Sequence, residues 1–261
     1  GTPGGRGEPA DGGVGAAVRL DRCLDAQVLA NTVAGMFLQG IVTRQVRAAC
    51  VQCNDVKGLR GDGIVLTSIP SGVIEIANND VHGCGGSGIV VADCGLPTIP
   101  STASSSGSAG AALSDGAAAA SSSLLSTAGG GDATDASTSS IRVLIAENTV
   151  TLCKGNGIAV LPGGTVFPST EKGTAKGKDG DSRFNITKNT VSRSDRSGVL
   201  LAGGEFVVSE NKFDNNREHG LEVRGSYTFS MVNQNTSTLN WLCGFFLWED
   251  PNVTIKGNIG M

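Results

Sequence analysis

The sequence lacks the features that mark membrane-spanning, nucleic-acid-binding and secreted proteins. It contains no run of 18 apolar residues, so we predict no membrane span. Lys and Arg are scattered and the formal net charge is −4 at pH 7, which argues against a nucleic-acid groove. The N-terminal residues 1–18 are Gly-rich and polar, without the apolar segment of a secretory signal. At 261 residues the chain is long enough for one elongated domain.

Cysteine and histidine are too few and too irregular to predict a disulfide framework or a metal centre. The seven cysteines are an odd number without a regular spacing, which favours a reducing compartment and an intracellular, cytoplasmic location. Cys50 and Cys53 form a CxxC motif, but no second such motif and no nearby His completes a zinc set. We therefore predict no metal site and no cofactor.

What the sequence does contain is a regular repeat. Seven times an Asn is followed nine residues later by a Gly and then by an apolar residue. Five of the seven steps between successive Asn residues, counted on to Asn258, are 22 to 25 residues long, and the other two contain insertions. The pairs are Asn31 and Gly40, Asn54 and Gly63, Asn79 and Gly88, Asn148 and Gly157, Asn189 and Gly198, Asn211 and Gly220, and Asn235 and Gly244.

Each repeat has the residue alternation of short strands with one buried face. The position three before every Asn is β-branched, and apolar residues occupy the first and nearly every third position after each Gly. A unit of this length without an amphipathic helical stretch predicts an all-β fold, a right-handed parallel β-helix. This single-stranded solenoid should have about seven to eight coils, with stacked Asn amides at one bend. We expect the Gly to allow the tight turn that opens the next strand.

Two cysteines fit the same repeat. Cys84 and Cys153 both lie five residues after a repeat Asn, where earlier coils carry Met36 and Leu59. Equivalent positions in adjacent coils face the same way, so we predict that both thiols fill the core.

The repeat resembles that of the pectin-lyase-like superfamily, especially the repeats of nitrous-oxide-reductase accessory proteins and F-box-only-protein-11-like proteins. The resemblance covers roughly residues 20–261 and implies the parallel β-helix fold. Proteins with this fold include sugar lyases, hydrolases, epimerases and noncatalytic binding modules, so the resemblance alone does not assign a function. Its sugar-cleaving members work on the outer surface of a sheet with clustered carboxylates, often with calcium.

The expected organisation is one solenoid with three segments outside the repeat. Residues 1–19 form a Gly-rich flexible N-terminal segment, and residues 20–261 form the β-helix. Residues 95–140 are almost wholly Ser, Ala, Gly and Thr and are predicted to be disordered, whereas residues 162–183 form a polar loop. Both insertions leave the coil at the same corner, either as a paired flap over a binding face or because this corner tolerates insertions.

Candidate catalytic residues lie near one outward position of the repeat. Glu222 is the one carboxylate among the positions two and four after each Gly, whereas a paired-carboxylate site needs two. Arg224 is its nearest charged neighbour in the sequence. Stacking should place His219 between Ser197 and Cys243, as a nucleophile with a base requires. These residues are candidates for a polysaccharide lyase or glycoside hydrolase, with calcium under the lyase alternative.

The same outward positions form an apolar stripe. Outward positions of a solvated sheet should be polar, so the stripe implies a cover, either a partner protein, the chain's own insertions or a further domain. We therefore predict a noncatalytic binding or scaffold module that recognises a protein partner through this lateral face. A carbohydrate-active enzyme and a structural rod within a larger assembly are the alternatives, and the oligomeric state stays open. The stripe consists of Val42, Val65, Val90, Ala159, Leu161, Leu200, Phe246 and Trp248.

Overall fold

The computed structural model describes residues 15–94, 141–161, 182–225, 230–248 and 253–261. The predicted insertion at 95–140 lies outside these residues, as does most of the 1–19 segment and of the 162–183 loop. The solenoid begins with a strand at Ala16, a few residues before the expected boundary, and strand structure resumes at Ser182 inside the expected loop. Within the described ranges, no helix is long and apolar enough to cross a membrane.

The described residues form 24 strands in three parallel sheets. Sheet A contains β1 (Ala16–Asp21), β4 (Gln39–Arg44), β7 (Asp62–Thr67), β10 (Ile89–Ala92), β13 (Ile158–Leu161), β16 (Val199–Leu201), β19 (Leu221–Arg224) and β22 (Phe245–Trp248). Sheet B contains β2 (Asp25–Leu29), β5 (Ala48–Gln52), β8 (Gly72–Ala77), β11 (Ile141–Ala146), β14 (Ser182–Thr187), β17 (Glu205–Ser209), β20 (Ser230–Asn233) and β23 (Val253–Lys256). Sheet C contains β3 (Thr32–Ala34), β6 (Asp55–Lys57), β9 (Asp80–His82), β12 (Thr149–Thr151), β15 (Thr190–Ser192), β18 (Lys212–Asp214), β21 (Thr236–Thr238) and β24 (Ile259–Gly260).

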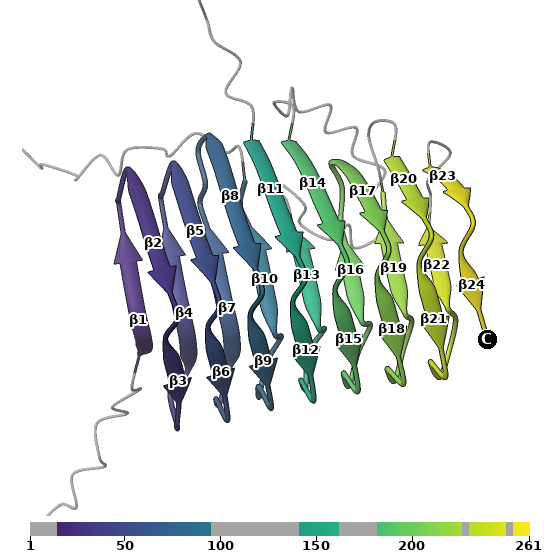
Figure 1. The fold of residues 1–261 in the computed structure, drawn as a ribbon, viewed down its shortest axis with the longest axis horizontal. Coiled ribbons are helices and arrows are strands. Elements are labelled where there is room, and N and C mark those ends of the chain that lie inside the picture. The colour runs from purple at the N-terminus through teal and green to yellow at the C-terminus, as the bar shows by residue number, and fades with distance from the viewer. Residues whose placement is uncertain (1–14, 95–140, 162–181, 226–229, 249–252) are drawn as a thin grey trace, which may run out of the picture. The chain divides into compact units, whose positions relative to one another are not determined.

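Each coil contributes one strand to each sheet, and every strand pairs with its equivalents in the coils before and after it (Figure 1). Residues 95–140 lie between β10 and β11 in the sequence, and β11 pairs in register with β8 of the preceding coil and β14 of the following coil, so the stack continues without a gap. The predicted all-β parallel β-helix is confirmed, and the long insertion interrupts the chain without interrupting the sheets.

The core runs along the inside of the stacked coils. The β-branched residues three before each Asn, from Val28 to Val232, are 0–4% exposed, as their alternation predicts. Cys84 and Cys153 are each 1% exposed and belong to the same apolar cluster, which confirms that they fill the core. Ser237, the sheet C equivalent of Val191, is also fully buried, and its hydroxyl donates to the Gly244 carbonyl at 3.0 Å.

The repeat Asn side chains form a continuous hydrogen-bonded ladder. The Asn148 amide nitrogen donates to Asn189 Oδ1 and to the Ile76 carbonyl, each at 2.9 Å. Its Oδ1 accepts from the side chain and the backbone N–H of Asn79, at 2.9 and 3.0 Å. These bonds satisfy buried polar groups that would otherwise be unpaired, and they confirm the predicted stacking. The linked pairs are Asn31–Asn54, Asn54–Asn79, Asn79–Asn148, Asn148–Asn189, Asn189–Asn211, Asn211–Asn235 and Asn235–Asn258.

The repeat glycines have a different role from the one predicted. None of the seven has a positive φ, so they do not supply a left-handed turn. A Cβ added to Gly157 would lie 2.7 Å from the carbonyl oxygen of Gly198 in the next coil. The same contact, at 2.5–2.7 Å, would occur at each of the first six repeat glycines. Glycine is therefore required here because neighbouring coils approach too closely for any side chain.

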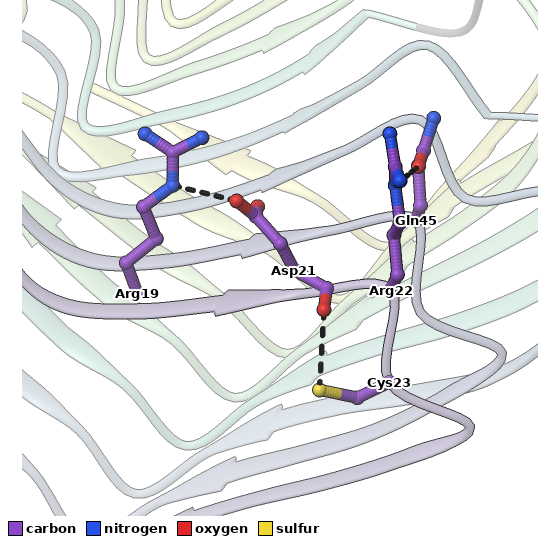
Figure 2. A network of polar contacts seen from close by, with 5 residues as sticks. All are labelled: Arg19, Asp21, Arg22, Cys23 and Gln45. Carbon is purple, nitrogen blue, oxygen red and sulfur yellow. Dashed lines mark hydrogen bonds and ion pairs between the residues drawn. The ribbon is translucent and has the colours of Figure 1, made fainter.

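The left-handed corners are built mostly by residues other than glycine. Among the residues that the structure describes, fifteen of this kind have φ between 53° and 58°, a conformation that costs about 1–2 kcal/mol per residue. Arg22 and Gln45 occupy one such corner in consecutive coils, and Arg22 Nε donates to Gln45 Oε1 at 3.1 Å (Figure 2). The Arg22 backbone N–H also donates to the Arg44 carbonyl of the next coil at 2.9 Å. Hydrogen bonds between coils thus hold a backbone conformation that the side chains themselves do not favour.

Candidate functional site

The register of sheet A places the predicted stripe on its outer face. Val42 lies opposite Val65, Val65 opposite Val90, and Val90 opposite Ala159. The same row continues through Leu200 to Glu222 and Phe246. Leu161 and Trp248 lie in the adjacent outward row, at the ends of β13 and β22. The predicted residues are therefore brought together as two neighbouring rows on one face.

Much of this outer face is buried. Val42, Val65, Ala159 and Leu200 are only 3–6% exposed, although they are not part of the interior cluster. They are buried within this single chain, so a separate partner cannot reach them as the chain stands. Val90, Leu161 and Phe246 are half-buried, and Trp248 is 53% exposed. The accessible part of the stripe is therefore concentrated at β22.

Glu222 is the centre of a polar cluster on the same face. The residue is 2% exposed, and both of its carboxylate oxygens are engaged. Oε1 accepts from the Arg224 guanidinium at 2.5 Å, and Oε2 accepts from the Ser197 hydroxyl at 2.6 Å. A buried carboxylate needs such a cation and hydrogen-bond donor, because desolvation otherwise disfavours its charge. The arrangement holds Arg224 in place beside the carboxylate, with the Arg224 side chain 38% exposed.

A second carboxylate joins this cluster from outside the strand. Glu218 Oε2 lies 3.5 Å from the Ser197 hydroxyl oxygen, so one hydroxyl sits between two acids. Glu218 lies in the turn before β19, at a position that strand alternation does not assign to either face. The outward strand positions alone therefore do not pair Glu218 with Glu222. The sequence signal that was available is the four-residue spacing of two glutamates around a repeat Gly.

The predicted pairing of His219 with a nucleophile does not form. The Ser197 hydroxyl points to carboxylates, while the His219 ring stacks on Phe246 with centroids 4.4 Å apart and an interplanar angle of 10°. His219 Nδ1 is buried without a hydrogen-bond partner among the described residues. The imidazole thus serves as an aromatic neighbour of Phe246, and Cys243 is an exposed free thiol.

The accessible end of the face combines an aromatic and a guanidinium group. Trp248 lies opposite Arg224 in the register of β19 and β22, and Phe246 lies opposite Glu222. The ion pair with Glu222 therefore fixes Arg224 next to the exposed indole. Exposed Trp and Arg side chains held in a fixed geometry are typical anchors of protein interfaces.

Two thiols among the described residues, those of Cys50 and Cys94, have raised pKa values. Within that part of the chain, no group of three or more His, Cys, Asp or Glu side chains is placed to hold a metal ion. Burial, reinforced by Asp93, raises the pKa of Cys94 to about 12, which keeps it a neutral thiol at physiological pH. Burial and the nearby Glu75 likewise raise the pKa of Cys50 in the CxxC motif. Neither thiol has the lowered pKa that a reactive cysteine needs.

Comparisons with known proteins agree with the fold. A family model described as a right-handed β-helix region matches residues 16–170 and 177–260. This match confirms the predicted handedness of the coils. No curated protein and no solved structure matches the chain.

Proposed function

The chain belongs to the right-handed β-helix family. We propose that it is a noncatalytic module that binds a protein partner. The recognition surface is the β22 end of the outer face of sheet A, formed by Phe246, Trp248 and Arg224. The observation that carries the proposal is the 53% exposure of Trp248 on a face where the other apolar side chains are buried or half-buried. A large exposed indole beside a fixed guanidinium is the composition of an interface hot spot.

The environment of Glu222 supports a noncatalytic role. A general acid or a nucleophile has to reach its substrate within hydrogen-bond distance. Glu222 is 2% exposed, and Arg224 and Ser197 occupy its two oxygens. Its carboxylate therefore acts on the chain itself, as the group that positions Arg224 for a partner.

A carbohydrate-active enzyme is the second candidate, and one observation favours it. Glu218 and Glu222 both approach the Ser197 hydroxyl, at 3.5 and 2.6 Å. Most glycoside hydrolases cleave the glycosidic bond with a pair of neighbouring carboxyl groups. Under this alternative, calcium would assist a lyase reaction on an acidic sugar polymer.

The test uses the two tryptophans as a matched pair. Trp241 is 77% exposed and precedes β22, whereas Trp248 ends that strand. Immobilised wild-type, Trp248→Ala and Trp241→Ala proteins are incubated with an extract of the source cells, and captured proteins are quantified by mass spectrometry. We expect a partner that is retained by wild type and Trp241→Ala and lost by Trp248→Ala.

The same proteins are incubated with uronic-acid polymers and neutral glycans, with and without calcium. Products that disappear in Glu222→Gln and Glu218→Gln would replace the binding proposal with the enzymatic one. If the wild type, Trp248→Ala and Trp241→Ala capture the same proteins in the same amounts, the proposal of a binding surface at β22 is wrong.

A further inference from the structure

A second surface lies on the outer face of sheet B, away from the residues of the proposed binding surface. A groove of about 370 Å³ crosses β8, β11, β14 and β17, four consecutive strands of that sheet. Backbone of Val143, Phe184 and Phe206 lies at its floor, since these side chains are buried in the core. The groove is therefore built on the rigid part of the coils.

One wall of the groove is a charged row. The register aligns Val73, Arg142, Arg183 and Glu205 on successive strands, about 4.8 Å apart. Arg183 Nε pairs with Glu205 Oε2 at 3.2 Å. Arg142 is exposed, and its side chain makes no ion pair or hydrogen bond with any residue that the structure describes. Two adjacent guanidiniums with one carboxylate leave a surplus positive charge that an anionic group would stabilise.

The other wall continues the row of Glu75 in β8, and from β11 onward it is apolar except for one amide. Leu144 lies opposite Asn185, and Asn185 lies opposite Val207. Val207 is 38% exposed, and Met231, 43% exposed, extends the row to β20. Asn185 carries both a donor and an acceptor, which is what the amide of another backbone needs. A ligand that fits both walls has carboxylates and apolar side chains close together, along a chain with amide groups.

We propose that this groove binds an acidic peptide segment of a partner protein, with a carboxylate between Arg142 and Arg183 and apolar side chains against Leu144 and Val207. Arginine pairs with carboxylates through two parallel hydrogen bonds, which fixes the orientation of the segment. A small inorganic anion would make no contact with the apolar wall, and a neutral sugar would form no ion pair with the arginines. The site is on a different sheet from Trp248, so it does not depend on the function proposed there.

The test is a binding titration on the full chain. Fluorescence anisotropy follows a labelled peptide of sequence Leu-Glu-Leu-Asp-Leu and its neutral counterpart, Leu-Gln-Leu-Asn-Leu. We expect the neutral peptide to bind the wild type about tenfold more weakly, because a charge-assisted hydrogen bond is lost. Arg142→Gln should weaken binding of the acidic peptide by about the same factor. Arg60→Gln, an exposed arginine outside the groove, is the control and should leave binding unchanged.

One variant separates a specific site from general loss of structure. Glu205 competes with the ligand for Arg183, so Glu205→Gln should tighten binding of the acidic peptide by about threefold. Damage to the fold would not tighten binding, and circular dichroism checks that each variant stays folded.

Three results would overturn the proposal. The first is equal binding of the two peptides, or no binding of either. The second is an Arg142→Gln protein that binds the acidic peptide like the wild type. The third is competition in which inorganic phosphate or an oligogalacturonate displaces the peptide at lower concentration than unlabelled peptide does, which would identify a small-anion or carbohydrate site instead.

Discussion

The interior corners and the outer faces of this solenoid follow opposite rules. The Asn ladder places the same side chain in every coil from Asn31 to Asn258 and joins each Asn to the next by the same amide-to-Oδ1 hydrogen bond. The outer face of sheet A changes from buried Val42 and Val65 in early coils to Glu222 and Trp248 in late ones. Residues that repeat hold the coils together, and residues that differ between coils give a surface its specificity. Function is therefore expected where the repeat is broken.

The largest effect is expected at the centre of the ladder. Asn148→Ala removes a buried side chain whose amide and carbonyl serve Asn189, Ile76 and Asn79. Several buried groups lose their partners, so we expect the free energy of unfolding to fall by about 4 kcal/mol. Urea denaturation measures this change. Asn31→Ala, at an exposed position of the same ladder, should lower the unfolding free energy by less than about 1 kcal/mol. Equal losses of unfolding free energy in the two variants would show that burial does not determine how much a ladder Asn stabilises the fold.

A somewhat smaller effect is expected at the repeat glycines. Gly157→Ala forces a Cβ to within 2.7 Å of the Gly198 carbonyl oxygen, which is backbone and cannot rotate away. We expect a loss of about 3 kcal/mol in unfolding free energy. Gly58 provides the control, since it has φ +68° and an added Cβ would meet open space there. Gly58→Ala should cost about 1 kcal/mol through its left-handed backbone, and a larger cost at Gly58 than at Gly157 would contradict the steric explanation.

The polar cluster of sheet A should respond by an intermediate amount. Arg224→Met removes the cation from the buried Glu222 carboxylate, so we expect the unfolding free energy to fall by about 2 kcal/mol. In the Arg224→Met background, Glu222→Gln should restore part of that loss, because it removes the uncompensated charge. Thermal and urea unfolding of the single and double variants test this. If Glu222→Gln brings no recovery, the ion pair does not hold this face together.

The smallest effect is expected at an exposed ion pair. Arg19 Nε and Asp21 Oδ2 are 2.8 Å apart, with side chains 55% and 40% exposed (Figure 2). Solvent screens such pairs, so Asp21→Asn should change the unfolding free energy by less than about 0.5 kcal/mol. Urea denaturation measures this change in unfolding free energy. A loss as large as that of Arg224→Met would show that burial does not determine how much an ion pair stabilises this fold.

The repeat predicted the fold because its signal is periodic and redundant. The spacing of Asn and the β-branched position before it specify the ladder and the inner strand positions without any long-range information. The role of glycine was misjudged because a sequence does not give the distance between coils, and it is that distance which excludes a Cβ at Gly157. The left-handed corners at residues such as Ala30 and Lys188 were also missed, since neither side chain favours that conformation.

The sites were harder to predict than the fold. Glu218 joins Glu222 from a turn, where strand alternation assigns no direction. Arg142 and Arg183 lie on neighbouring strands, but the second insertion separates them in the sequence. Side-chain contacts across coils depend on register, and the insertions hide that register until the strands are aligned.

If the partner is recognised through Trp248, its affinity depends on that side chain and not on Trp241. The partner captured from the source cells is purified and titrated by calorimetry against wild type, Trp248→Ala and Trp241→Ala. We predict that Trp248→Ala raises Kd by about 30-fold while Trp241→Ala changes it by less than about threefold. Equal Kd values for the wild type and Trp248→Ala would contradict the claim and place recognition elsewhere on the solenoid.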